Sequence, residues 1–424
     1  MIRENINSNR ERKTVLLLTY YFDPCTYVAA NRPNSFAKEL KNHGFNVEVV
    51  TRHWGGKEQI WGDYLKGISN DLQIEESENF RVHRLPYEPT TYFRNKLLSK
   101  CQALFRIATG KINHDVNYYQ YKKYISNLLT EIKVDFIIVT IPPINALRVA
   151  AELSKKYKVK LFVDVRDYEN KIVLNKYLKI RFLYMLRHKL TLMHSIKWFN
   201  QASLIFTVTP PITNFIKKTT HKPVLTVMNG YQEKLLNINE STYSDFYITL
   251  VGSVYEIPEF AELLKGFKLL FTKEFSQELK IQFIGSSTSE SVVQKLKDAI
   301  PARNLILKNR LPQELAMTEA ARSQLLLVLG FKNMKGVLGT KPFEYMGLRK
   351  TIIQMPGDED LMQKIILECN AGYCPVSAEQ FVNVIENCFV EWRNNGSLKY
   401  NGNIDLIRKY SREEQFKQLL DYFV

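Results

Sequence analysis

Cysteine is scarce in this chain, and the few cysteines follow no recognisable pattern. The 424 residues include five cysteines, an odd number, and no two of them stand in Cys-x-x-Cys spacing. That spacing is typical of structural zinc sites and of many redox motifs. The scarcity argues against a disulfide framework and fits a protein kept in a reducing compartment.

Long apolar runs are also missing. No stretch reaches the roughly 18–20 consecutive apolar residues that a membrane-spanning helix needs. The first thirteen residues are polar and charged, unlike a signal peptide. We therefore expect a cytoplasmic protein whose contact with a membrane is peripheral. The seven histidines show no metal-binding spacing such as His-Glu-x-x-His, so no metal and no other cofactor is expected.

Negative charge is the minority sign. The formal net charge is +16 and the pI is about 9.4, which favours an anionic partner. Residues 94–111 and 176–199 are basic and apolar and free of acids, and the second stretch is also rich in aromatic residues. Such segments suit the anionic inner face of a membrane, and the alternative is covering helices with a solvated basic side. No nucleic-acid-binding motif accompanies the charge, so no nucleic-acid partner is expected.

Apolar and amphipathic segments alternate along the chain, and the alternation restarts after a polar stretch at 230–245. Strands that alternate with helices predict parallel sheets covered on both faces, and the length predicts two domains. The expected strands are 15–21, 45–51, 136–141, 160–165, 204–208 and 224–228, then 246–251, 280–284, 305–308, 325–329 and 351–354. The expected helices are 31–43, 145–157 and 175–199, then 258–271, 289–299, 312–321, 341–346 and 359–369, with a terminal helix at 404–424.

Ligands of doubly wound sheets bind at the carboxyl ends of the strands, and one such loop carries the strongest signal. It is the segment Gly339-Thr340-Lys341-Pro342-Phe343-Glu344-Tyr345. Thr340 would cap a helix whose amino terminus, with Lys341, suits a diphosphate. The Glu344 carboxylate would accept hydrogen bonds from a ribose diol. The alternative is an ordinary capped helix whose Lys341 and Glu344 face solvent.

The segment from Gly339 to Tyr345, together with the Met-Gly-Leu-Arg-Lys-Thr-Ile-Ile that follows it, resembles the donor-site helix of glycosyltransferase family 4. That family has the GT-B fold. Further resemblances follow in order: the opening Leu-Leu-Leu-Thr-Tyr-Tyr-Phe-Asp-Pro, Asp-Val-Arg-Asp at 164–167, Val-Met-Asn-Gly-Tyr at 227–231 and Tyr-Ser-Arg-Glu-Glu-Gln at 410–415. The Asp-Val-Arg-Asp segment at 164–167 is similar to a segment of the family's capsule and O-antigen branch. The order and spacing of these segments over about 400 residues carry the resemblance.

The resemblance implies an α/β protein of GT-B type, with two Rossmann-like doubly wound domains that face a central cleft. An acceptor-binding domain would span 1–232, rejoined by the terminal helix 404–424, and a donor-nucleotide-binding domain would span 233–403. The activity implied is sugar transfer from a nucleotide-sugar to a saccharide acceptor, lipid-linked, in bacterial surface polysaccharide synthesis, with retention and without metal.

The resemblance also assigns residues. The donor-binding set is Gly252, Ser253, Tyr255, Gly285, Arg310, Leu311, Gly339, Thr340, Lys341 and Glu344. The acceptor-binding set follows from position instead: Arg166 and Asp167 come at the end of a predicted strand, and Arg32 at the start of the first predicted helix. The catalytic set is Asp167, Lys341 and Glu344. Asp167 has the alternative of a helix cap or an ion pair with Arg166, and Arg32 the alternative of a surface arginine.

On the donor side, three positions depart from the family's pattern. Gly336, Ser253 and Glu259 stand where many members have a glutamate, an arginine and a lysine. We expect Lys341 to supply the missing positive charge. Two other functions stay open. A sugar-nucleotide 2-epimerase can have the same fold, and the departures also leave room for a non-catalytic sugar-nucleotide-binding protein.

Overall fold

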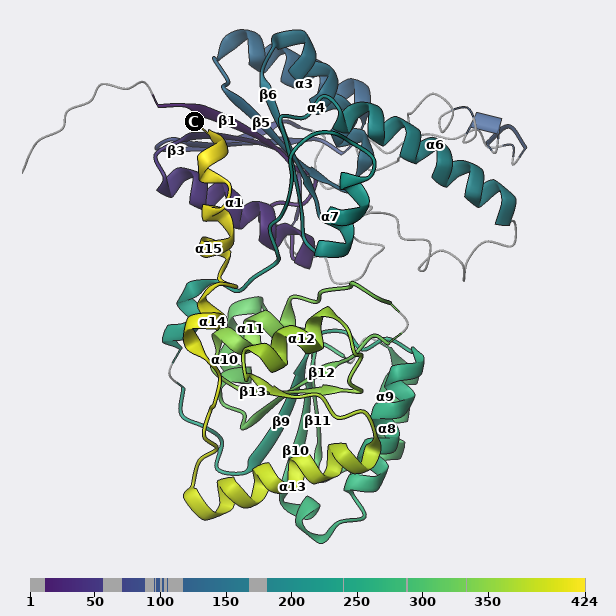
Figure 1. Cartoon of the computed structure of the whole chain (residues 1–424), viewed down its shortest axis with the longest axis vertical. Helices are drawn as coiled ribbons and strands as arrows, with labels where there is room; N and C mark the ends of the chain where they lie inside the picture. The colour runs from purple at the N-terminus through teal and green to yellow at the C-terminus, as the bar shows by residue number, and fades with distance from the viewer. Residues whose placement is uncertain are drawn as a thin grey trace, which may run out of the picture. The chain divides into compact units, whose positions relative to one another are not determined.

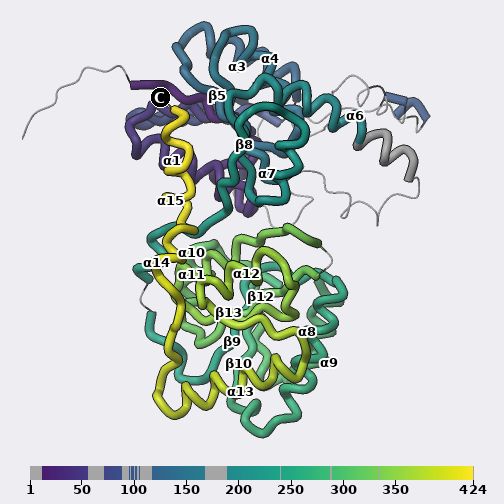
Figure 2. Tube along the Cα trace, viewed as in Figure 1, coloured from purple at the N-terminus to yellow at the C-terminus, as the bar shows by residue number. Residues whose placement is uncertain are grey.

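The computed structural model describes residues 12–55, 71–87, 95, 97–99, 101–102, 105, 117–167, 181–238, 240–286, 289–332 and 334–423. In the helix at 181–199, side chains are described from Lys189 onward. By its internal contacts the chain divides into two units (Figures 1 and 2). Unit 1 is Met1–Val227 with Leu420–Val424, and unit 2 is Met228–Leu419.

Unit 1 is built on an eight-stranded sheet in the order β3-β4-β2-β1-β5-β6-β7-β8. The strands are β1 Thr14–Leu18, β2 Asn46–Arg52, β3 Gln73–Ser77, β4 Phe80–Leu85, β5 Phe136–Ile141, β6 Lys160–Val165, β7 Leu204–Thr207 and β8 Val224–Thr226. The helices are α1 Asn31–Asn42, α3 Tyr118–Glu131, α4 Ile144–Tyr157, α6 Arg181–Phe199 and α7 Pro210–Lys217. All neighbouring strands are parallel except β3 and β4.

The central strands of unit 1 are buried on both faces, as their continuous apolar runs require. Every residue of β5 is buried, and β6 is buried from its second residue onward. Helix α4 lies over them and contributes buried residues from its first to its third turn. At the far edge, α7 begins where the Thr209 side chain accepts a hydrogen bond from the Ile212 backbone amide, with proline in its first turn.

Unit 2 is a six-stranded parallel sheet in the order β11-β10-β9-β12-β13-β14 (Figure 1). The strands are β9 Phe246–Val251, β10 Leu279–Ile284, β11 Leu305–Lys308, β12 Leu325–Leu329, β13 Thr351–Met355 and β14 Gly372–Tyr373. The helices are α8 Pro258–Leu270, α9 Glu290–Ala299, α10 Gln313–Ala321, α11 Lys341–Gly347, α12 Leu361–Glu368, α13 Ala378–Asn395, α14 Ile404–Arg408 and α15 Arg412–Lys417.

The two faces of the second sheet are covered by different helices. Buried residues of α8, α9 and α13 pack with one set of strand residues, and those of α10, α11 and α12 pack with the alternate set. This alternation follows from the period of two along a strand. Helix α11 packs on the second set of strand residues, which includes residues of β12 and β13. Its first residue, Lys341, lies next to Gly252, which follows the carboxyl end of β9.

The sequence predicted β5, β6, β9, β11 and β12 with their observed bounds. It missed β3, β4, α3, α7, β14 and α13, and the expectation of parallel sheets alone was wrong for the antiparallel pair β3 and β4. The single terminal helix expected at 404–424 is also wrong. Ser411 starts a new helix by accepting a hydrogen bond from the Glu414 amide, so the chain forms α14, α15 and the short turn Leu420–Phe423.

Residues 175–180 of the expected basic helix, and most of the basic stretch 94–111, lie outside the described residues. Among the residues that are described, no helix combines the length and the hydropathy needed to cross a membrane.

Candidate functional site

Two glycines mark the carboxyl edge of the second sheet. Gly252 follows β9 with φ of +121°, and Gly285 follows β10 with φ of +86°, a region that favours glycine. The Gly252 amide donates to the Ile284 carbonyl at 2.9 Å, and the Gly285 amide donates to the Lys308 carbonyl at 2.9 Å. The ends of β9, β10 and β11 are thus joined, with two side-chain-free positions at the edge.

Helix α11 is attached to the same edge. The Val251 amide donates to the hydroxyl of Tyr345 at 2.9 Å, and Tyr345 is fully buried. Burial raises the pKa of Tyr345 above its ordinary value, so the hydroxyl stays neutral. Thr340 lies at the cap position, as expected, but its side chain makes no capping bond because its backbone is already helical. The Thr340 carbonyl instead accepts from the Glu344 amide at 3.2 Å.

The Glu344 carboxylate is the most enclosed charged group at this edge, with 0% of the residue exposed. Lys341 Nζ donates to its Oε2 at 2.6 Å, and Gln313 Nε2 donates to its Oε1 at 2.6 Å. An Arg412 Nη2 atom lies 3.9 Å from the same Oε1. Buried charges persist in proteins when they are paired and hydrogen-bonded, as this one is. The alternative of a solvent-facing Glu344 is therefore wrong.

Lys341 differs from Glu344 in being reachable. Its side chain is 29% exposed. A Cβ atom placed on Gly252 would contact the Lys341 Cε atom at 4.0 Å, so the lysine stem runs past the loop after β9. The ammonium therefore stands between the glycine backbone and the Glu344 carboxylate. The loop after β9 therefore has a partly exposed positive charge beside it.

The remaining donor-side residues lie around this centre. Arg310 is exposed, and its Cα lies 3.7 Å from where a Cβ on Gly285 would be. Ser253 and Tyr255 are exposed on the loop after Gly252. Leu311 and Gly339 are half-buried on the loops that lead into α10 and α11.

The carboxylate of Asp360 stands beside Gly336, the position where many resembling proteins have a glutamate. The Gly336 amide donates to Asp360 Oδ2. Lys335 Nζ donates to the Asp358 carbonyl at 2.7 Å, which ties the loop after β12 to the loop after β13. The sequence placed these aspartates only near the start of a helix. Within the described ranges, no three His, Cys, Asp or Glu side chains are arranged to hold a metal ion.

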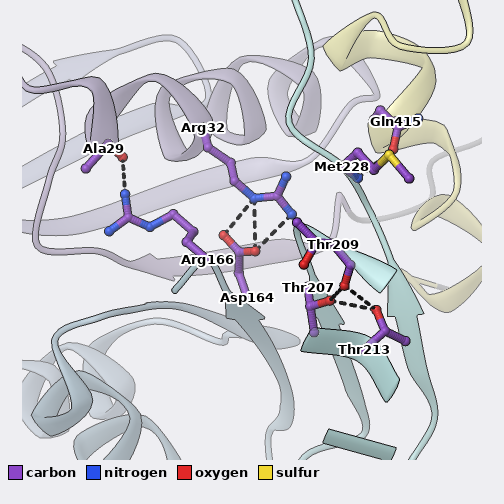
Figure 3. A network of polar contacts seen from close by, with 9 residues as sticks. All are labelled: Ala29, Arg32, Asp164, Arg166, Thr207, Thr209, Thr213, Met228 and Gln415. Atoms are coloured by element: carbon purple, nitrogen blue, oxygen red, sulfur yellow. Dashed lines mark hydrogen bonds and ion pairs between the residues drawn. The ribbon is translucent and has the colours of Figure 1, made fainter. Parts of the chain in front are cut away.

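In unit 1, Arg32 on α1 points at Asp164 on β6 (Figure 3). Its Nε lies 3.0 and 3.1 Å from the two carboxylate oxygens, and its Nη2 lies 2.9 Å from Oδ1. Side-chain exposure is 8% for Arg32 and 0% for Asp164. The guanidinium also lies 4.7 Å from the Phe36 ring centre. Arg32 is therefore not a surface arginine, and its partner in the structure is a buried carboxylate that sequence reasoning missed.

Arg166 and Asp167, adjacent in sequence, have different surroundings. Arg166 is buried and donates to the Ala29 carbonyl at 2.7 Å (Figure 3). It also donates to the Pro142 carbonyl at 3.2 Å, which joins the loops after β1 and β5. Asp167 is exposed and, among the described residues, pairs with neither Arg166 nor another cation. Of the three acceptor-side candidates, Asp167 is the one whose charged group faces solvent.

Two residues that contact Glu344 were not foreseen. Gln313 is the first residue of α10, three positions after Arg310, and Arg412 lies 68 positions from Glu344 along the chain. Gln313 follows a strand end, so the rule that points to such loops would have reached it. Arg412 has no local signal, because only tertiary structure brings α15 to α11.

Comparison with known proteins rests on structure alone. No sequence family matches the chain, and no curated protein matches it by sequence. A trehalose-phosphate synthase (UDP-forming) from Burkholderia vietnamiensis shares 11% identity, with TM-score 0.59, over 97% of this chain and 99% of that one. HepE from Anabaena, in complex with UDP, shares 12% identity, with TM-score 0.61, over 97% and 99%.

An E. coli trehalose-6-phosphate structure bound with UDP-2-fluoro glucose shares 11% identity with this chain, with TM-score 0.62, over 96% of this chain and 98% of that one. At these identities the likeness establishes the fold. The chain has two doubly wound α/β units of the GT-B type, as the sequence predicted.

Proposed function

We propose that this protein is a glycosyltransferase that moves a sugar from a nucleotide-sugar donor to a saccharide acceptor. One observation carries the proposal. At the carboxyl edge of the second sheet, two positive-φ glycines, a reachable lysine and a buried carboxylate converge where doubly wound sheets bind nucleotides. The neighbours of the same fold that are described with UDP or UDP-2-fluoro glucose make a nucleotide-sugar the natural ligand to test.

The donor would bind through its charges first. The Gly252 and Gly285 backbones allow a close approach, and Lys341 supplies a full positive charge to the diphosphate. Once Lys341 turns to the phosphates, the Glu344 carboxylate can accept hydrogen bonds from the ribose diol. Arg310 and Leu311 would border the base, with Ser253 and Tyr255 beside the phosphates and the Gly339 and Thr340 backbone behind them.

The acceptor side of the proposal rests on unit 1. Asp167, exposed at the end of β6, would bind or activate the acceptor hydroxyl. Arg32 and Arg166 would support this edge through their buried contacts. We further propose a retaining transfer without metal, within bacterial surface polysaccharide synthesis, as the resemblance to family 4 implies.

A lipid-linked acceptor would bring the protein to the inner face of the membrane. Three apolar side chains within the basic stretch 94–111 support this: Leu97 is 70% exposed, Leu98 51% and Phe105 64%. Exposed apolar residues among basic ones favour anionic lipid surfaces. Binding to vesicles that contain phosphatidylserine, and its loss as salt rises, tests this part.

A thermal-shift screen of nucleotide-sugars tests the donor site. A ligand that binds only the folded protein stabilises it by RT ln(1 + [L]/Kd), about 2.7 kcal/mol at a concentration of 100 Kd. We expect at least one nucleoside diphosphate sugar to raise the melting temperature. Glu344→Ala and Lys341→Met should each remove most of that rise. A folded Glu344→Ala protein with an unchanged rise would remove Glu344 from the site.

Product analysis with the donor found in the screen then separates the activities. Transfer to an added saccharide, or hydrolysis of the donor, supports a transferase. An epimerised nucleotide-sugar without transfer would instead indicate the 2-epimerase. Tight binding without turnover against any acceptor, water included, would indicate a binding protein.

A further inference from the structure

Two segments that are far apart in sequence cross next to α11. We call residues 228–231 and 410–415 the chain crossing; both segments belong to unit 2. The Tyr231 amide donates to the Tyr410 carbonyl at 3.2 Å, and the Arg412 amide donates to the Tyr231 carbonyl at 2.8 Å. A Cβ atom on Gly230 would lie 2.3 Å from the Tyr410 carbonyl oxygen. The two backbones are therefore in direct contact, and glycine is required at the point of contact.

The chain crossing packs directly on α11. A Cβ atom on Gly347 would lie 2.5 Å from the Tyr231 ring, so the ring rests against the helix backbone. The rings of Phe343 and Tyr410 lie 5.5 Å apart. The chain crossing therefore packs against α11, the helix that carries Lys341 and Glu344.

Arg412 extends this contact to the donor site. It is 8% exposed, and its Nε donates to the Gly230 carbonyl at 2.9 Å. Its Nη2 lies 3.9 Å from Glu344 Oε1, close enough for an ion pair but longer than a hydrogen bond. The guanidinium therefore has one end fixed at the crossing and the other facing Glu344.

Glu344 is faced by two cations that differ in mobility. Lys341, on its own helix, has a flexible stem and an exposed side, and Arg412, on α15, is buried and anchored. Gln313, on α10, is neutral, and the adjacent Tyr345 hydroxyl is bonded to the Val251 amide. A diphosphate near Gly252 would compete with Glu344 for Lys341 alone. When Lys341 turns away, Arg412 is the one cation, of those in the described part of the chain, that stays within ion-pair distance of the buried carboxylate.

We propose that Arg412 is a positioning residue of the donor site, which balances the Glu344 carboxylate when the donor's diphosphate draws Lys341 away. This rests on the proposed function. Without Arg412, releasing Lys341 would leave a buried carboxylate without a counter-charge, which is unfavourable. The lysine would stay with Glu344, and the site would bind the diphosphate weakly.

A double-mutant cycle tests whether Arg412 acts through Glu344. The probe is inorganic pyrophosphate, which lacks the ribose that Glu344 is proposed to bind, with affinity measured by calorimetry. We expect Arg412→Gln to weaken pyrophosphate binding about 10-fold in the otherwise unchanged protein and less than about 2-fold in a Glu344→Gln background. Arg412→Lys, which keeps the charge, should recover most of the affinity. An equal loss in both backgrounds would overturn the proposal, because a merely structural role does not depend on Glu344.

Two controls keep the outcomes distinct. Arg393→Gln, which removes an exposed arginine paired with Glu278, should leave the affinity unchanged. If Arg412→Gln alone does not fold, the double variant should fold, since it lacks the buried carboxylate; a double variant that also fails to fold overturns the proposal. Failure of the proposed function gives different results. The unmodified protein would bind no nucleoside diphosphate, or the Lys341→Met variant would bind pyrophosphate as well as the unmodified protein does.

Discussion

Each sheet has a cation and a carboxylate paired near its carboxyl edge, and the two pairs differ in access. In unit 1, Arg32 and Asp164 have side-chain exposures of 8% and 0%. In unit 2, Lys341 and Glu344 have exposures of 29% and 1%. When both side chains of a pair are buried, no ligand can reach them and the pair serves only stability. When the cation is accessible, it can release its carboxylate partner and bind an anionic group of a ligand instead.

The two cations also differ in how many contacts fix them. Arg32 reaches both carboxylate oxygens, and its guanidinium lies over the rings of Phe36 and Phe206. Lys341 makes one hydrogen bond to Glu344 from a flexible stem. A planar guanidinium is pre-organised for such bidentate contacts, and an ammonium is a mobile point charge. The comparison therefore assigns stability to the first pair and ligand exchange to the second.

The largest expected effect is loss of the closed pair. Arg32→Met leaves Asp164 buried and unpaired, which should lower the free energy of unfolding by about 3–5 kcal/mol. Arg148→Met, which breaks a partly exposed pair with Glu152 in the same unit, should cost no more than about 1 kcal/mol. Urea unfolding curves measure both. If both variants lost the same free energy of unfolding, burial of the ion pair would make no difference, and the contrast between the two pairs would be wrong.

A second expected effect concerns a cation without a partner. Lys350, between α11 and β13, has no ion-pair partner among the described residues. Burial, and to a lesser degree the nearby Arg349 charge, lower the pKa of Lys350 to about 8. A shift of that size corresponds to at most about 3 kcal/mol. Solvent screening at a partly exposed site reduces this to about 1–2 kcal/mol.

Lys350→Met should therefore stabilise the protein by about 1–2 kcal/mol at pH 7. The folded-state pKa is lowered, so between pH 8 and 10.5 the unfolded chain holds more protons, and stability due to this group rises with pH across that window. The variant should lose this rise. Thermal unfolding from pH 7 to 10 measures it, and a variant that is less stable at pH 7 would contradict the expectation.

Much of the fold could be predicted from the sequence, and there are physical reasons why the rest could not. Apolar runs gave β5, β6 and β9 because strands buried on both faces leave a continuous signal. Strand β3 escaped because all five of its residues are exposed, so no burial pattern marks it. The terminal helix was merged although Ser411 and Glu414 stand in the Ser-x-x-Glu spacing of a capping box, which marks the start of a helix.

The site shows the same division. The loop rule and the glycines led to Lys341 and Glu344, whose contact spans only three residues. The burial of Glu344 could not be foreseen, because it depends on Gln313 and Arg412 arriving from other elements. Arg32 was expected to bind an acceptor anion, and its pairing with Asp164, 132 residues away, needed the register of the sheet. Local chemistry was visible in the sequence, and the partners that decide its use were not.

The smallest expected effects on stability come from substitutions of two glycines, one in each unit. Gly44, after α1, has φ of +84° with no atom within 4 Å of an added Cβ, and Gly252 has φ of +121° with only Lys341 Cε at that limit. Alanine at either position has room but a strained backbone, so each substitution should cost roughly 1 kcal/mol of stability. Gly252→Ala alone should weaken binding of a nucleoside diphosphate, because its methyl group occupies the surface that the phosphates would approach. Gly44→Ala is the control, because it also puts alanine at a positive φ and lies outside the proposed site. If calorimetry showed that both variants keep full affinity, Gly252 would not lie on the surface that the phosphates approach.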